Sequence, residues 1–87
     1  MHNVYLGFVR TRLDSLKASI ERRDPPEDVR FYADNLMAMV QEVEGMIRMF
    51  ADVRTREGLR KALEHAAKGR MELVVQVLDE VVPKEEA

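Results

Sequence analysis

Apolar residues recur along the first quarter of the chain at alternating intervals of three and four positions. They are Leu6, Val9, Leu13, Leu16 and Ile20. Because an α-helix turns by about 100° per residue, this spacing places them on one stripe of a helix, as in a coiled-coil seam. The pattern predicts a first helix from about Val4 to Arg23 that packs through this stripe.

The segment RRDPPED ends this helix and begins a second one. Proline lacks the amide hydrogen that a helix interior needs, and it disfavours helical geometry in the residue before it. Asp24 is predicted as the N-cap, with Pro25 and Pro26 in the first turn of a helix that extends from Pro25 to about Arg54. Its apolar stripe comprises Val29, Ala33, Leu36, Val40, Val43, Ile47 and Phe50. A neighbouring row makes the apolar face wide enough for two partner helices and comprises Tyr32, Met39, Met46 and Val53.

A third helix is predicted to start after Thr55 as its cap, and Gly69 raises the main alternative. The letters AAKGR are typical of a helix end, with Lys68 in the last turn and Gly69 just beyond it. However, neither of the next two residues can act as an N-cap. The apolar face also continues in helical register across the glycine, through Leu59, Leu63, Ala66, Leu73, Val74, Val77, Leu78 and Val81. We therefore expect one continuous helix from about Arg56 to Val82.

The predicted fold is all-α: a single domain over residues 1–87 that forms an up-down-up, three-helix antiparallel bundle. The helices are expected at about 4–23, 25–54 and 56–82, and the alternative has four helices with the third broken at Gly69. Strand-type alternation and hairpin dipeptides are absent from the sequence. Since a chain this short buries a modest share of its surface and has no cysteine, self-association is an expected source of further stability.

Charge alternates in blocks along the chain. The net charge is +3 over residues 1–23, −4 over 24–54, +2 over 55–69 and −3 over 70–87. Such blocks suit antiparallel helices that attract their neighbours. The overall net charge of −2 argues against a general nucleic-acid binder, because phosphate contacts dominate that affinity.

Several classes of chemistry are disfavoured by what the sequence contains. It has no cysteine for a thiol nucleophile or thiolate metal site, and no phosphate-binding glycine loop. No pair of histidines or Glu-x-x-His spacing indicates a metal site. A signal peptide or membrane span is not expected, since no long apolar run exists. The sequence therefore predicts a cytoplasmic, non-enzymatic protein without a cofactor, metal or small-molecule substrate.

Methionine and aromatic side chains at the rims of apolar faces indicate a protein interface. Met37 and Met49 lie at the edges of the second helix's face, and Tyr5 and Phe8 lie off the seam of the first helix. We expect a helical homodimer formed through the first and second helices, with these four residues as contacts. Contact with another protein, in a regulatory or assembly role, is expected as well.

A basic cluster follows the second helix and comprises Arg54, Arg56, Arg60, Lys61, Lys68 and Arg70. DNA is not the expected partner. If the chain formed a helix-turn-helix with its turn at Gly69, the helix that reads DNA would be RMELVVQVLDEVV. That segment is apolar and acidic and has almost no group to contact bases or phosphates. The cluster is predicted to contact an acidic protein surface.

His65 raises two alternatives. The letters HAAKG resemble the His-x-x-Lys-Gly pattern of histidine phosphotransfer domains, and this resemblance implies His65 as phosphate acceptor with Lys61 and Lys68 assisting. By helical register His65 is expected on the solvent-facing flank, with Gly58 and Gly69 leaving room on either side. Separately, the spacing of Arg60 and His65 resembles the Arg-x4–6-His motif of HEPN ribonucleases, which implies an RNA-cleaving pair at a dimer interface.

Overall fold

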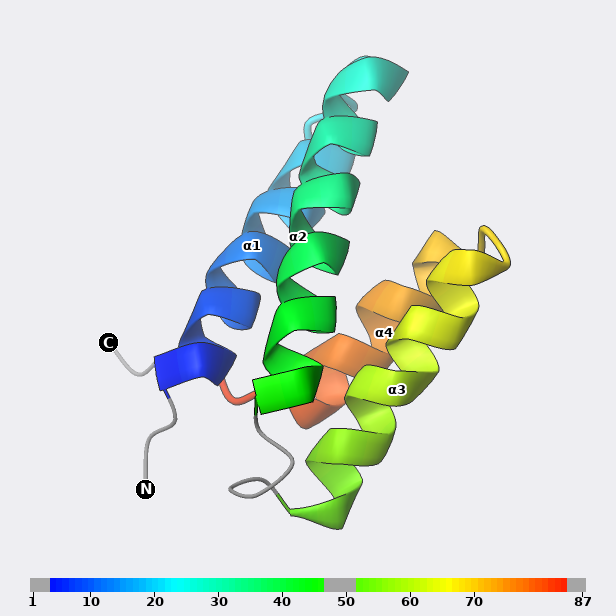
Figure 1. Cartoon of the computed structure of the whole chain (residues 1–87). Coiled ribbons are helices and arrows are strands. Elements are labelled where there is room, and N and C mark those ends of the chain that lie inside the picture. The colour runs from blue at the N-terminus through cyan, green and yellow to red at the C-terminus, as the bar shows by residue number, and fades with distance from the viewer. Residues whose placement is uncertain (1–3, 47–51, 85–87) are drawn as a thin grey trace.

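The computed structural model describes residues 4–46 and 52–84, and these form four helices and no strand. The helices are α1 (Val4–Glu21), α2 (Pro26–Met46), α3 (Val53–Ala67) and α4 (Met71–Val81). The all-α prediction is confirmed. The three-helix prediction is wrong, and the alternative with a break at Gly69 fits the structure (Figure 1).

The four helices form two antiparallel hairpins, α1 with α2 and α3 with α4 (Figure 1). The second hairpin packs beside the end of the first that holds the start of α1 and the end of α2, and the α1–α2 turn projects beyond it. The Cα atoms extend over 38 × 33 × 18 Å, so the molecule is a flat slab.

The core lies between the hairpins and includes most of the predicted stripes. Its buried apolar residues are Leu6, Val9, Leu13, Leu16, Ala33, Leu36, Val40, Val43, Leu59, Ala62, Val74, Leu78 and Val82. Ile20 was predicted to belong to it but is 47% exposed. Ile20 lies near the end of α1 that projects beyond the second hairpin, whereas α4 contacts α1 nearer its start, at Arg10 and Lys17. Of the predicted α2 stripe, Ile47 and Phe50 lie outside the described residues.

The α1–α2 turn ends α1 at Glu21 and corrects the predicted cap of the second helix. Asp24 accepts hydrogen bonds from the Ser19 hydroxyl (2.8 Å) and from Arg22 Nη2 (2.7 Å). The carbonyl oxygen of Pro25 accepts the first amide bonds of α2, so Pro25 holds the N-cap position. Asp24 is thus a turn residue whose carboxylate points back toward α1.

The start of α3 corrects a second boundary. Asp52 has extended backbone angles, and its carboxylate accepts a hydrogen bond from the Thr55 amide at 2.7 Å. An acceptor three residues before an amide is the usual N-cap geometry, so Asp52 is the cap in place of Thr55. The prediction that the second helix reaches Arg54 is therefore wrong, because Val53 and Arg54 belong to α3. Residues 47–51 lie outside the described part.

Gly69 ends α3 by adopting a left-handed backbone conformation with φ +72°. Its amide donates to Ala66 O (3.0 Å), and the Arg70 amide donates to His65 O (2.9 Å), which together form a Schellman motif. As the sequence indicated, α4 then starts without a side-chain cap. The continuous helix from Arg56 to Val82 is wrong because two amphipathic helices that face each other across a hairpin can keep the same apolar register as one long helix.

Candidate interaction surfaces

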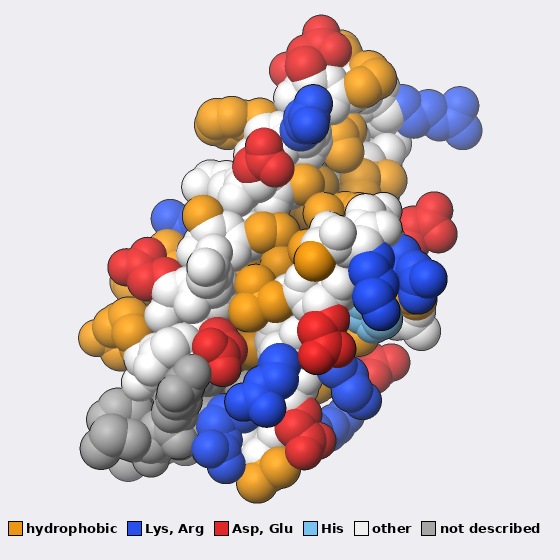
Figure 2. Space-filling model, turned by 45° about the vertical axis from the view of Figure 1, so that its right-hand side comes forward, with side chains coloured by type: hydrophobic (Ala, Val, Ile, Leu, Met, Phe, Trp, Pro, Cys, Tyr) orange, Lys and Arg blue, Asp and Glu red, His pale blue; other side chains and the backbone are white. Residues whose placement is uncertain are grey.

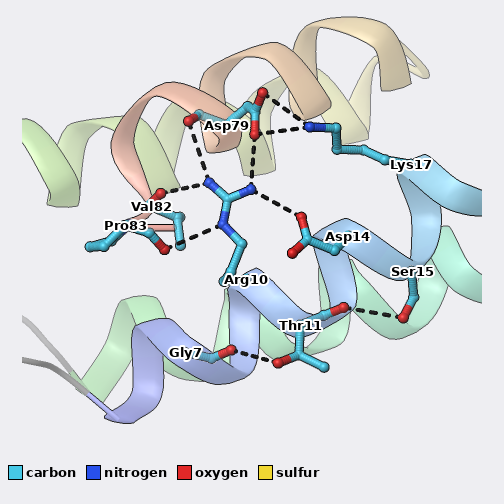
Figure 3. A network of polar contacts seen from close by, with 9 residues as sticks. All are labelled: Gly7, Arg10, Thr11, Asp14, Ser15, Lys17, Asp79, Val82 and Pro83. Carbon is cyan, nitrogen blue, oxygen red and sulfur yellow. Dashed lines mark hydrogen bonds and ion pairs between the residues drawn. The ribbon is translucent and has the colours of Figure 1, made fainter. Parts of the chain in front are cut away.

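Arg10 is the centre of a polar network that joins α1 to the end of α4 (Figure 3). Its side chain is only 2% exposed. The guanidinium donates to the carboxylates of Asp79 (2.9 Å) and Asp14 (3.1 Å), and to the carbonyl oxygen of Val82 (2.7 Å). It also donates to Pro83 O at 3.3 Å and to Asp79 O at 3.4 Å. Since a guanidinium has five N–H donors, this group is fully satisfied inside the protein and is not open to a ligand.

Asp79 is held by two cations from α1. Besides Arg10, Lys17 Nζ lies 3.2 Å from both carboxylate oxygens of Asp79. The hydrogen bond from Arg10 is the main cause that lowers the pKa of Asp79 below its ordinary value, and Lys17 adds to it against the opposing effect of burial. Sequence analysis missed this site. Its signal was the place of Arg10, four residues after Leu6 and three before Leu13, on the apolar stripe itself.

Tyr5 and Phe8 lie together near the start of α1. They are 39% and 44% exposed, and their rings make an edge-to-face pair with centroids 6.3 Å apart. With the exposed Val4 they form an apolar area that we call the α1 patch (Val4, Tyr5, Phe8). Two of the predicted contact residues are therefore brought together on the surface.

The other two predicted contacts are not part of this patch. Met37 is half-buried and packs against the core. It lies seven residues before Glu44, which approaches Arg60 of α3 at 4.0 Å, so Met37 is on the α3 side of α2. Met49 lies outside the described residues.

The predicted basic cluster divides over α3 and the turn that follows. Arg60 approaches Glu44 of α2, and Arg56 is half-buried. Arg54, Lys61 and Lys68 are exposed and lie at intervals of seven residues, which places them in one row along the outside of the helix. Arg70, also exposed, follows Gly69.

The surroundings of His65 match the resemblance to phosphotransfer domains only in part, and its role as phosphate acceptor stays a prediction. It is half-buried in the last turn of α3, where a solvent-facing position was expected. Lys61 and Lys68 are exposed, as the resemblance implies, but Gly58 is buried. A Cβ at Gly58 would lie 2.6 and 2.7 Å from the methyl carbons of Val81, so this glycine serves the close approach of α3 and α4 and opens no surface beside His65.

The Arg60–His65 pair does not converge on one site either. Arg60 is directed toward Glu44 of α2. Five positions along a helix correspond to a rotation of about 140° between side chains. The two side chains therefore leave α3 in different directions.

Features of other site classes are sparse in the part of the chain that the structure describes. Within residues 4–46 and 52–84, no three His, Asp or Glu side chains are grouped so that they could hold a metal ion. An open surface hollow lies at the α3–α4 turn, lined by Gly69, Arg70, Met71, Glu72 and Leu73. No helix among the described residues has the length and apolarity to cross a membrane.

Fold and surface together define an all-α protein of two packed helical hairpins, with a buried arginine network inside and apolar and charged areas outside. A scan against protein-family profiles finds no match, and searches of curated proteins and of solved structures find none either.

Proposed function

We propose that this protein works by protein contact, as a small non-enzymatic module that forms a homodimer and serves a regulatory or assembly role. The observation that carries the proposal is the Tyr5–Phe8 pair, which the fold leaves exposed with Val4 as one apolar area on the surface of α1. Gathered apolar side chains of this kind mark contact surfaces.

Exposed apolar side chains support the same proposal. Among the described residues, the large hydrophobic side chains that stay exposed are Val4, Tyr5, Phe8, Ile20, Phe31, Met46, Val53 and Leu73. Single exposed apolar residues are ordinary, but gathered ones mark contact surfaces. The fully satisfied Arg10 network, by contrast, offers no free group for chemistry.

Sedimentation velocity tests the proposal on the full chain, at protein concentrations from about 1 to 100 µM, where weak homodimers populate both states. We expect a species of twice the chain mass of 10.1 kDa whose share rises with concentration. A strict monomer over the whole range would overturn the proposal.

A further inference from the structure

The end of α2 lies beside α3, and the two helices diverge toward the α1–α2 turn, so both contribute to one broad side of the slab (Figure 1). Figure 2 shows a band of hydrophobic side chains along the middle of this face, and beside it Lys and Arg side chains with Asp and Glu side chains among them. The Arg60–Glu44 approach at 4.0 Å crosses the boundary between the two helices. We call this boundary the α2–α3 seam. The half-buried Met37 lies on the side of α2 that faces α3.

The two halves of this face carry opposite charge. Helix α2 holds five carboxylates and one arginine, for a net charge of −4. Helix α3 holds four basic and two acidic side chains, for a net charge of +2, and Lys68 and Arg70 follow it directly. Asp34 and Glu42 on α2, and Lys61 at the middle of α3, are exposed to solvent. The face thus has a net acidic side at α2 and a net basic side at α3, although the exposed Glu57 and Glu64 lie among the basic side chains of α3.

We propose that this face binds a second copy of the chain, related by a two-fold axis that runs along the α2–α3 seam. Rotation about that axis places α2 of each copy over α3 of the other, so acidic and basic halves meet twice and the apolar bands meet between them. A two-fold axis in the plane of the face but perpendicular to the seam would place α2 over α2 and α3 over α3. Like charges would then repel each other. A two-fold interface uses the same surface on both copies, so that surface must be complementary to itself. A face with one acidic and one basic side meets this requirement.

This inference rests on the proposed homodimer and assigns its contact surface. A purely acidic partner would be complementary to α3 but would repel α2 on the same face, whereas a second copy is complementary to both helices. The α1 patch (Val4, Tyr5, Phe8) remains outside this contact and available to a different protein.

Charge reversal on each half of the face tests the proposal. One variant carries Asp34→Lys with Glu42→Lys, and the other carries Lys61→Glu with Lys68→Glu. The first variant brings the net charge of α2 from −4 to 0, and the second brings that of α3 with Lys68 and Arg70 from +4 to 0. Each variant alone thus loses the charge attraction between its own copies, so we expect the dissociation constant to rise by about tenfold or more. When mixed in equal amounts, the two variants should form a heterodimer, because the unchanged α2 of one meets the unchanged α3 of the other. A chain with all four substitutions has no net charge on either half and should stay as weak as each variant alone.

Two control variants separate this surface from the alternatives. Glu21→Lys with Glu80→Lys reverses exposed charges on α1 and α4, and it should leave the dimer unchanged. Phe8→Ser removes the more exposed aromatic side chain of the α1 patch and should leave the dimer unchanged as well. Circular dichroism of every variant checks that the helices are retained, and the milder pair Asp34→Asn with Glu42→Gln, which should weaken the dimer, replaces a reversal that fails to fold.

The outcomes distinguish this inference from the proposed function. A wild-type dimer that persists in both folded reversal variants would overturn the α2–α3 face and leave the homodimer standing. Loss of the dimer in Phe8→Ser alone would do the same and would move the contact to the α1 patch. A wild-type chain that is monomeric throughout would overturn both proposals.

Discussion

Arg10 shows how one residue can determine the position of an element distant in sequence. Its guanidinium binds the carbonyl oxygens at the end of α4, where a helix exposes unpaired acceptors and its negative dipole end. The planar group also reaches Asp79 on the same helix. Lysine at this position would keep the charge but could not donate in five fixed directions. The placement of α4 against α1 therefore depends on arginine specifically.

The lowered pKa of Asp79 predicts a pH-dependent contribution to stability. A carboxyl whose pKa is lower in the folded state stabilises the fold above its unfolded pKa, and this contribution is lost as pH falls through the folded value. Asp79→Asn should cost about 1–2 kcal/mol at pH 7. The gap in unfolding free energy between wild type and Asp79→Asn should close as the pH falls from above the unfolded pKa of an aspartate, about 3.9, through the lower folded value.

Urea denaturation followed by circular dichroism at several pH values measures this gap. Asp24 and Asp52 also have lowered pKa values, but they are present in both proteins and cancel in the difference. Glu80→Gln, at an exposed neighbouring position, is the matched control and should show no gap. A gap between wild type and Asp79→Asn that stays constant with pH would contradict the role assigned to Asp79.

At the scale of elements, both hairpins turn by the same backbone geometry with different residues. In the first hairpin the Asp24 amide donates to Ser19 O, with Arg23 in the left-handed region at φ 57°. In the second the Arg70 amide donates to His65 O, with Gly69 at φ 72°. Glycine adopts this conformation without strain, and a residue with a Cβ does not. The first turn is therefore strained where the second is relaxed.

Replacing the glycine of the second turn and introducing a glycine in the first turn should change the free energy of unfolding in opposite directions. Gly69→Ala should lower the free energy of unfolding by about 1 kcal/mol. A Cβ at Gly69 meets no atom within 4 Å, so the loss would come from backbone conformation and not from a clash. Arg23→Gly should raise stability by about 0.5 kcal/mol, since relief of strain outweighs the flexibility gained by the unfolded chain. Thermal unfolding measures both, and equal signs would contradict this account.

Close packing of α3 on α4 at Gly58 gives a further prediction. Gly58→Ala should destabilise by about 1–3 kcal/mol because the added carbon meets the methyl groups of Val81, which cannot swing away as a long side chain does. The double variant Gly58→Ala with Val81→Ala should lose less than the sum of the two single changes. Additive losses in urea denaturation would show that the two residues do not share this contact.

At the scale of the whole molecule, the charge blocks of the sequence correspond to neighbouring helices. Arg10 and Lys17 join the first basic block to Asp79 in the last acidic block. Arg60 joins the second basic block to Glu44 in the first acidic one. Other charges on α2 and α3 are exposed to solvent, among them Asp34, Glu42 and Lys61.

Salt should therefore weaken the proposed dimer. Exposed charges interact through water, and salt screens them over a distance that shortens from about 10 Å at 0.1 M to about 3 Å at 1 M. We expect the dissociation constant to rise several-fold between these two concentrations, as measured by sedimentation equilibrium. A dimer held by the apolar α1 patch would instead be unchanged or tighter, because burial of apolar surface is not screened.

The sequence by itself determined what depends on local spacing. The α1 stripe from Leu6 to Leu16 is buried as its intervals predict, and the proline pair separates α1 from α2. Tyr5 and Phe8 are exposed as their register predicts, although their role as contacts stays a prediction.

Only the tertiary structure decided the features in which distant segments meet. Periodicity could not distinguish one long helix from two facing helices across Gly69, because both can produce the same register. The left-handed backbone conformation of Gly69 ends α3 and separates it from α4, so the segment forms two helices. The acceptors of Arg10 come from the end of α4, about seventy residues away in the chain, and no local pattern around Arg10 indicates them. Such pairings form through space, and a linear pattern carries no record of which segments meet.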